Sequence, residues 1–165
     1  MASSSSFTPS SSSTPSTPQR IHDVFLSFRG EDTRYNFTDH LYQALVGRGI
    51  SIFRDDKLWR GEGVGPELLK SIEESRSSVI VFSENYSHSR RCLDELVKIM
   101  ECQKDMGHAV FPIFYHVDPS HVRQQTGSFG EAFAGYEDNW TDKIPRWRTA
   151  LTEATILCGW HLQDG

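Results

Sequence analysis

The sequence predicts an α/β protein with a central parallel sheet and helices on both faces. Short runs rich in β-forming residues recur along the chain, and stretches with a helical spacing of apolar residues lie between them. Such alternation is typical of βαβ units, whose crossover helices cover the sheet. The length of 165 residues suggests one domain, and a hydrophobic content of 37% is sufficient for a core.

Four segments are predicted strands, and a fifth strand is only weakly indicated. The four are residues 22–28, 50–54, 78–83 and 109–115. Pro112 lies inside the last of them and has no N–H to donate. We therefore expect that segment to be an edge strand or to carry a bulge.

Five segments are predicted helices: residues 34–46, 66–74, 92–105, 128–138 and 144–157. Pro66 suits the first turn of the second helix. In the third helix the apolar residues Leu93, Leu96, Val97 and Met100 fall on one stripe, which predicts a single buried face.

The two ends of the chain differ in composition from this alternating region. Residues 1–20 are mostly Ser, Thr and Pro, with Arg20 as the one charged residue. Such a segment cannot bury enough apolar surface to fold, so we expect a disordered leader. A targeting peptide is the alternative, but a single Arg favours a flexible tail. We expect the domain over residues 21–162, with 163–165 as the start of a truncated linker.

Charge and hydropathy exclude several classes of partner. The formal net charge is -5, which argues against nucleic acid or an anionic membrane as the main partner. No apolar run reaches the roughly 18 residues that a membrane span needs. The three cysteines Cys92, Cys102 and Cys158 form no CxxC pair, which argues against a disulfide framework and favours a reducing compartment.

A metal site is also not expected. His116 and His121 lie near Asp118, but their spacing matches no standard set of metal ligands. A phosphoacceptor receiver domain would need an aspartate after the third strand, where this chain has Ser83 and Glu84.

The loops that follow the strands are the expected ligand site, because right-handed crossovers bring them to one edge of the sheet. Five ordered motifs lie in or beside these loops: DVFLSFRGEDTR (23–34), FRDD (53–56) continuing through RGE (60–62), CLDEL (92–96), FPIFYHVDPS (111–120) and QTGSF (125–129). Together they resemble the plant Toll/interleukin-1 receptor (TIR) domain family over about residues 21–162. The resemblance implies a flavodoxin-like three-layer fold with four to five strands, and self-association.

The resemblance also implies an activity, because many family members cleave the nicotinamide–ribose bond of NAD+. Glu95 matches the catalytic glutamate of the family. From periodicity alone it is a solvated carboxylate, nearly opposite the apolar stripe. One carboxylate can stabilise an oxocarbenium-like sugar, bind ribose hydroxyls or attack the sugar, and the sequence leaves these three roles open.

Further site residues follow from the same resemblance. The implied substrate-binding residues are Phe28, Arg29, Gly30, Arg34, Trp59, Ser89 and Arg91, and the implied self-association residues are Asp39 and His40. Phe28 is equally well explained as an ordinary core residue. Arg29 and Arg34 are alternatively solvated charges or partners of nearby carboxylates.

Three positions depart from the family pattern. Arg91 stands where the family usually has Trp, Trp59 where it often has a basic residue, and Asp39 where it often has Ser. Two hypotheses result. The first is an association-dependent NAD+ glycohydrolase that takes NAD+ or NADP+ as substrate, needs no cofactor and signals plant immune cell death. The second is a non-catalytic interaction module.

Partners and location are implied in the same way. We expect contacts with other TIR domains and downstream immune signalling proteins, in the cytoplasm and also in the nucleus. In plants such domains usually precede nucleotide-binding and leucine-rich-repeat regions.

Overall fold

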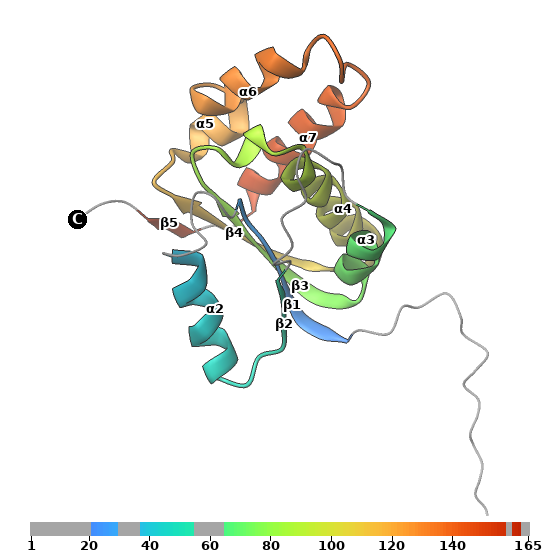
Figure 1. Cartoon of the computed structure of the whole chain (residues 1–165), viewed down its shortest axis with the longest axis vertical. Coiled ribbons are helices and arrows are strands. Elements are labelled where there is room, and N and C mark those ends of the chain that lie inside the picture. Colours follow the sequence, from blue (N-terminus) through green and yellow to red (C-terminus); the bar gives the residue numbers. More distant parts are fainter. Residues whose placement is uncertain (1–20, 30–36, 55–64, 158–159, 163–165) are drawn as a thin grey trace, which may run out of the picture.

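A five-stranded parallel sheet forms the centre of the molecule (Figure 1). The computed structural model describes residues 21–29, 37–54, 65–157 and 160–162. The strands are β1 (His22–Ser27), β2 (Ile52–Arg54), β3 (Ser75–Phe82), β4 (Ala109–Tyr115) and β5 (Trp160–Leu162). Their order, β2-β1-β3-β4-β5, is that of the flavodoxin-like fold, which confirms the predicted fold class.

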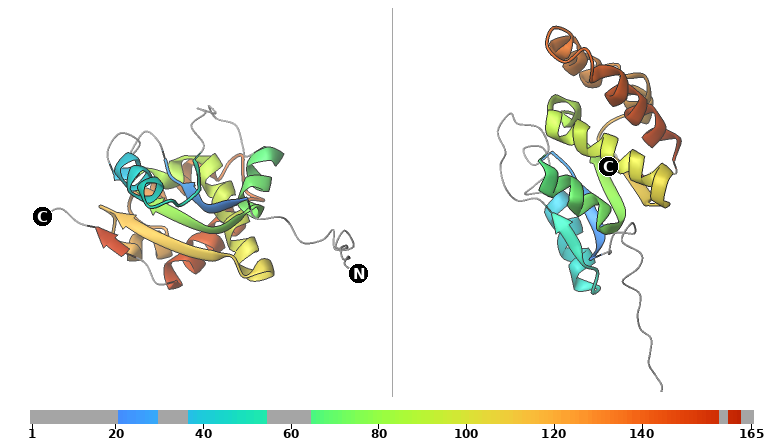
Figure 2. Two further views of the ribbon diagram at one scale, coloured as in Figure 1. Left: turned by 90° about the horizontal axis from the view of Figure 1, so that it is seen from below. Right: turned by 90° about the vertical axis from the view of Figure 1, so that its right-hand side faces the viewer.

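Helices lie on both faces of the sheet. Helix α2 (Phe37–Gly47) covers one face, while α3 (Pro66–Glu73) and α4 (Arg90–Met106) cover the other (Figure 1). The short helices α5 (Pro119–Gln124) and α6 (Ser128–Tyr136) precede α7 (Ile144–Ile156), which packs against α4 and α5. Figure 2 shows α7 beyond α4, on the side away from α2.

The sheet separates two hydrophobic cores of unequal size. The smaller core contains Leu26, Phe28 and Val81, packed against apolar side chains of α2. The larger core lies under α3, α4, α6 and α7, and includes Phe82, Leu93 and Trp147. Burial on both faces explains why the β3 sequence is a continuous apolar run from Val79 onward.

Strand β3 begins at Ser75, earlier than the sequence predicts. Ser75 and Ser78 are fully buried, and each has a hydrogen-bond partner. The Ser75 hydroxyl donates to the Ser71 carbonyl at 2.8 Å, and Ser78 Oγ lies 2.7 Å from His108 Nε2. These hydrogen bonds make buried serines acceptable in a central strand.

Two further elements differ from expectation. The loop after β4 contains α5, whose start is capped by the Asp118 carboxylate accepting from the Ser120 N–H at 2.9 Å. The expectation that the strand containing Pro112 is an edge strand or carries a bulge is wrong. Strand β4 lies between β3 and β5, and its pairing with β3 continues without interruption through Pro112. The ladder to β5 begins at Ile113, one residue after the proline.

The predicted leader at residues 1–20 and the terminal residues 163–165 lie outside the described residues. Among the helices that are described, none combines the length and apolar character needed to cross a membrane.

Candidate functional site

The candidate site lies where β1 and β3 end. Strand β1 ends at Ser27, and β3 leads through the 3-10 turn η3 (Tyr86–His88) into α4. Glu95 is in the second turn of α4 and reaches back to the end of β1. The Ser27 hydroxyl donates to Glu95 Oε1 at 2.8 Å, so the motifs of the first strand and of α4 meet in one hydrogen bond.

Glu95 is buried, with 2% of its surface exposed, so the expectation of a solvated carboxylate is wrong. The physical reason is that α4 contacts the sheet, η3, α3 and α7, which together enclose more of its surface than one apolar stripe. Burial of a charged group is costly unless polar partners surround it. The Glu95 carboxylate has such partners on two sides.

On the first side a chain of hydroxyl groups leads away from the carboxylate. Ser27 Oγ lies 2.9 Å from the Tyr86 hydroxyl, which lies 3.1 Å from the Cys92 carbonyl oxygen. Ser27, Tyr86 and Cys92 are all completely buried. The chain joins β1, η3 and the first turn of α4 in one polar network inside the larger core.

The groups of this network are held in their protonated forms. Burial, and then electrostatic interaction with Cys92 and Glu95, raise the pKa of Tyr86 well above its ordinary value. Burial, with a further contribution from Glu95, raises the pKa of the Cys92 thiol to about 12. At neutral pH the Tyr86 hydroxyl is therefore a hydrogen-bond donor, and Cys92 is a thiol that donates to the Phe28 carbonyl at 3.4 Å.

On the second side Glu95 faces a cation. Arg91 Nε lies 3.9 Å from Glu95 Oε2, and the two side chains are 13% and 3% exposed. Arg29 extends from the end of β1 toward η3, where its Nη1 donates to the Asn85 carbonyl at 3.4 Å. The site thus combines one buried carboxylate with guanidinium groups from two different elements.

Comparison with known proteins identifies the family. The TIR domain family model matches residues 21–165. The chain is 81% identical over 99% of its length to the disease resistance protein RPV1 of Vitis rotundifolia, and 54% identical over 89% of its length to the TMV resistance protein N of Nicotiana glutinosa. It spans 12% and 13% of the lengths of these two relatives. This chain belongs to the TIR domain family.

A solved structure of the family has the same fold. The TIR domains of the activated Roq1 resistosome, which directly recognizes the pathogen effector XopQ, match with a TM-score of 0.78 at 49% identity. The match covers 85% of this chain and 87% of that one.

The remaining predicted substrate residues of this TIR domain fall into three groups. Ser89 is the N-cap of α4, where its Oγ accepts from the Cys92 N–H at 3.2 Å. Phe28 is 3% exposed within the smaller core, which agrees with its reading as a core residue. Gly30, Arg34 and Trp59 lie outside the described residues.

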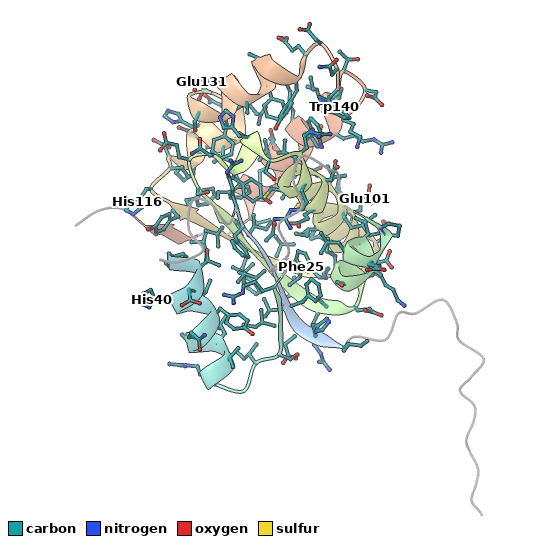
Figure 3. The ribbon with its side chains drawn as sticks, in the orientation of Figure 1. Phe25, His40, Glu101, His116, Glu131 and Trp140 are labelled. Atoms are coloured by element: carbon teal, nitrogen blue, oxygen red, sulfur yellow. The ribbon has the colours of Figure 1, made fainter. Side chains whose placement is uncertain are left out.

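The predicted self-association residues lie on α2, on the other face of the sheet from α4. His40 is exposed and points away from the sheet (Figure 3). Asp39 Oδ1 accepts a hydrogen bond from Arg54 Nη1 at 3.4 Å, and the Arg54 guanidinium stacks over the Tyr42 ring at 3.9 Å. The negative charge of Asp39, one of the three departures from the family pattern, is therefore paired with Arg54 of the same chain.

Two parts of the site were not found from the sequence. Ser27 was missed because it stands between the apolar residues Leu26 and Phe28, and Tyr86 because it lies in a polar segment outside the five motifs; neither belongs to a catalytic spacing. Asp94, beside Glu95, has a structural role, since its Oδ1 accepts from the Trp147 indole N–H at 3.0 Å and so joins α4 to α7. A polar residue inside a predicted buried strand, as Ser27 is, was the one available signal.

The surface between α4 and α7 contains an open groove, away from Glu95. Its lining includes Met100, Lys104, Arg146 and Glu153, and the Lys104 ammonium is 2.8 Å from the Glu153 carboxylate. Among the described residues no group of three His, Cys, Asp or Glu side chains is placed to hold a metal ion.

Proposed function

We propose that this TIR domain hydrolyses NAD+, and also NADP+, to nicotinamide and an ADP-ribose-type nucleotide. The observation that carries the proposal is the Glu95 carboxylate, buried at the carboxyl ends of the parallel strands and held there by Ser27. Ligands of open parallel sheets bind at this edge. A buried, hydrogen-bonded carboxylate with nearby guanidinium groups has the polar components that a dinucleotide with a cationic ring and a pyrophosphate would need.

The chemistry requires one carboxylate rather than an acid–base pair. When the C1′–N bond breaks, its electron pair passes to the pyridinium nitrogen, so nicotinamide leaves as a neutral molecule. The ribose then carries positive charge at C1′, which a nearby carboxylate stabilises, as in glycoside hydrolysis. Water adds at C1′ and releases one proton. Glu95 would stabilise the charged sugar, and Arg29 is the candidate for the pyrophosphate.

Burial of Glu95 supports an enzyme that depends on association. With 2% of Glu95 exposed, a substrate reaches the carboxylate only after neighbouring side chains move, and Arg91 is the nearest of them. We propose that contacts between TIR domains favour the open arrangement. The resistosome relative, whose structure contains TIR domains in an activated assembly, supports this step.

The disease resistance relatives support a role in plant immune signalling. We propose that other TIR domains and downstream signalling proteins are the partners, that the domain acts in the cytoplasm and nucleus, and that it works within a longer receptor. Nucleic acid and membrane are not proposed as partners.

A second candidate function is a non-catalytic interaction module. The observation that favours it is the Arg91–Glu95 pair, because an arginine that neutralises the carboxylate competes with a cationic substrate. In that case the same domain would associate but would not turn over NAD+.

The deciding experiment measures NAD+ consumption by purified protein at high concentration or on a crowding support. Glu95→Gln is the matched variant, because it keeps the shape and the ability to accept from Ser27 but removes the charge. Turnover in the wild type that disappears in Glu95→Gln supports the enzyme. Equal absence of turnover in both, with association retained, contradicts catalysis and leaves the interaction module.

A further inference from the structure

We propose that Ser27 and Tyr86 are positioning residues that hold Glu95 in place in both of its protonation states, through a chain of hydrogen bonds that reverses direction. The inference rests on the proposed function only for its effect on turnover. The chain itself consists of three contacts of 2.8, 2.9 and 3.1 Å that run from Glu95 Oε1 through Ser27 Oγ and the Tyr86 hydroxyl to the Cys92 carbonyl oxygen.

The number of protons in the chain is the first step of the argument. Each hydroxyl has one proton to donate and can also accept. The Cys92 carbonyl can only accept, and an ionised carboxylate can only accept. With two hydroxyl protons between two acceptors, three contacts cannot all be hydrogen bonds while Glu95 is ionised.

The ionised state fixes the direction of the chain. Ser27 donates to Glu95, so its oxygen is open to a donor, and Tyr86 donates to Ser27. Both protons then point toward the carboxylate, and the Tyr86–Cys92 contact is released. Hydrogen bonds to a charged acceptor are the stronger ones, and each donor in such a chain polarises the next.

The protonated state reverses every direction. The Glu95 carboxyl proton donates to Ser27, Ser27 donates to Tyr86, and Tyr86 donates to the Cys92 carbonyl. All three contacts are now hydrogen bonds, and the change needs only rotation of two hydroxyl groups. In the ionised state the Cys92 carbonyl gives up the Tyr86 hydroxyl but keeps its helical partner, the N–H of Leu96 in α4. Neither state therefore leaves a buried polar atom of the chain unpaired.

The charged and titratable groups around Glu95 are compatible with this chain. Arg91 and Cys92 face it from α4, Tyr86 from η3, and Ser27 from the end of β1, while Arg29 acts on the neighbouring Cys92. Burial raises the pKa of Tyr86 well above its ordinary value, so its proton stays available in both directions at neutral pH.

The consequence concerns turnover at low pH. Removing the Tyr86 hydroxyl weakens the ionised state more, because that state loses a donor whose hydrogen bond is strengthened by the charge. The protonated carboxyl can instead accept from Ser27 through its carbonyl oxygen, so no buried hydroxyl is left unpaired in that state. Tyr86→Phe should therefore move the acidic limb of the NAD+ cleavage profile to higher pH by roughly half a unit to one unit. At pH values on the acidic side of the limb, the rate of Tyr86→Phe should be roughly threefold to tenfold lower than that of the wild type.

Two comparisons make the test specific. Ser27→Ala removes the link itself, so it should shift the limb at least as far, and the double variant should add nothing to it. Tyr136→Phe is the matched control, because Tyr136 donates to the Ser87 carbonyl at 2.9 Å and takes no part in the chain. That control should leave the limb unmoved. A purely structural role of Tyr86 would lower the rate equally at all pH values.

A second measurement does not depend on turnover. The side-chain carboxyl carbon of Glu95, assigned by its loss in Glu95→Gln, is titrated by NMR in the wild type and in Tyr86→Phe. We expect the midpoint to be higher in the variant. An unmoved midpoint overturns the inference whether or not the protein cleaves NAD+, while a moved midpoint in a protein without turnover supports the inference and removes the proposed function.

Discussion

At the scale of single residues, the decisive pair is Arg91 and Glu95. Their side chains are 13% and 3% exposed, so water screens their attraction little. An arginine four residues before a glutamate is the less favourable order on a helix. The attraction between Arg91 and Glu95 therefore depends on their burial rather than on their order along the helix. Loss of either side chain leaves the other as a buried, uncompensated charge.

Arg91→Leu should destabilise the domain by about 3 kcal/mol, because it strands the Glu95 carboxylate in the core. Chemical denaturation measures the effect. Lys104→Ala is the control, since Lys104 and Glu153 form an exposed pair that contributes less than about 1 kcal/mol. Adding Glu95→Gln to Arg91→Leu should recover part of the loss. An equal, small effect of both single variants would show that the buried pair is dispensable.

Stability should fall in alkaline solution. The pKa of Cys92 is about 12 in the folded state, against an ordinary value of 9.0. Between pH 9 and 12 the unfolded chain releases a proton that the folded chain keeps, so the free energy of unfolding decreases by about 1.4 kcal/mol per pH unit for this group. Tyr86 and Tyr136, whose pKa values are also raised, add to the slope above pH 10. Below pH 9 this contribution is fully present.

Denaturation curves at pH 8, 9 and 10 test the expected decrease. Cys92→Ala removes one titrating group, so its slope between pH 9 and 10 should be shallower than that of the wild type, whatever its absolute stability. Parallel slopes would contradict the assigned cause.

The candidate catalytic residue, Glu95, was predictable from the sequence, but its burial was not. Glu95 was found from the motif around it, whereas periodicity placed it in solvent. The burial of Glu95 depends on η3, α3 and α7 reaching α4 from three directions, which no pattern within 92–105 encodes.

At the scale of elements, α4 is defined at both ends by local chemistry. Ser89 caps its first turn, and Gly107 ends it in the left-handed region with φ of 67°. The helix thereby begins two residues before the predicted start, which brings Arg90 and Arg91 into its first turn. Arg90 then stacks on the Trp140 ring at 4.2 Å, which ties the connection between α6 and α7 to this end of α4 (Figure 3).

Substitution at Ser89 separates capping from substrate binding. Ser89→Ala should cost about 1 kcal/mol of stability, because the Cys92 N–H loses its acceptor. Ser89→Asp should retain the cap and fold like the wild type. If Ser89 also contacts substrate, Ser89→Asp will lose NAD+ cleavage without losing stability. If Ser89 only caps the helix, the NAD+ cleavage activity of each variant will change in parallel with the stability of that variant.

The elements most difficult to predict are those whose polar residues are satisfied by distant partners. The first three residues of β3 are Ser75, Arg76 and Ser77, which do not form an apolar run. They belong to the strand because they pair with β1 and because the Ser77 hydroxyl donates to the Asp23 carbonyl at 2.9 Å. By contrast, α3 and α7 were predicted within a residue or two, and each has a proline in its first turn, where the missing N–H costs the helix nothing.

At the scale of the whole molecule, the sheet separates the two proposed tasks. The candidate site lies between β1, η3 and α4, while α2 lies on the opposite face and exposes His40 (Figure 1). Variants of α2 should therefore change association without disturbing the carboxylate.

His40→Ala should weaken self-association and lower NAD+ cleavage in parallel, with the free energy of unfolding unchanged, because the side chain is exposed. Sedimentation velocity across a concentration series measures association. Arg123→Ala, exposed on α5, is the control and should behave as the wild type. Reduced cleavage with unchanged sedimentation would place His40 in catalysis and contradict the assignment.

The position of Pro112 has a consequence for how the protein behaves when crowded. Strand β5 pairs with β4 from Ile113 onward, so in the described part of the chain residues 109–112 of β4 are bordered by a strand only on the β3 side. An unpaired strand margin can recruit a second polypeptide and seed fibrils. Here that margin is four residues long and ends in a residue that cannot donate a hydrogen bond, which makes it a poor template for fibril growth at the concentrations that signalling would require.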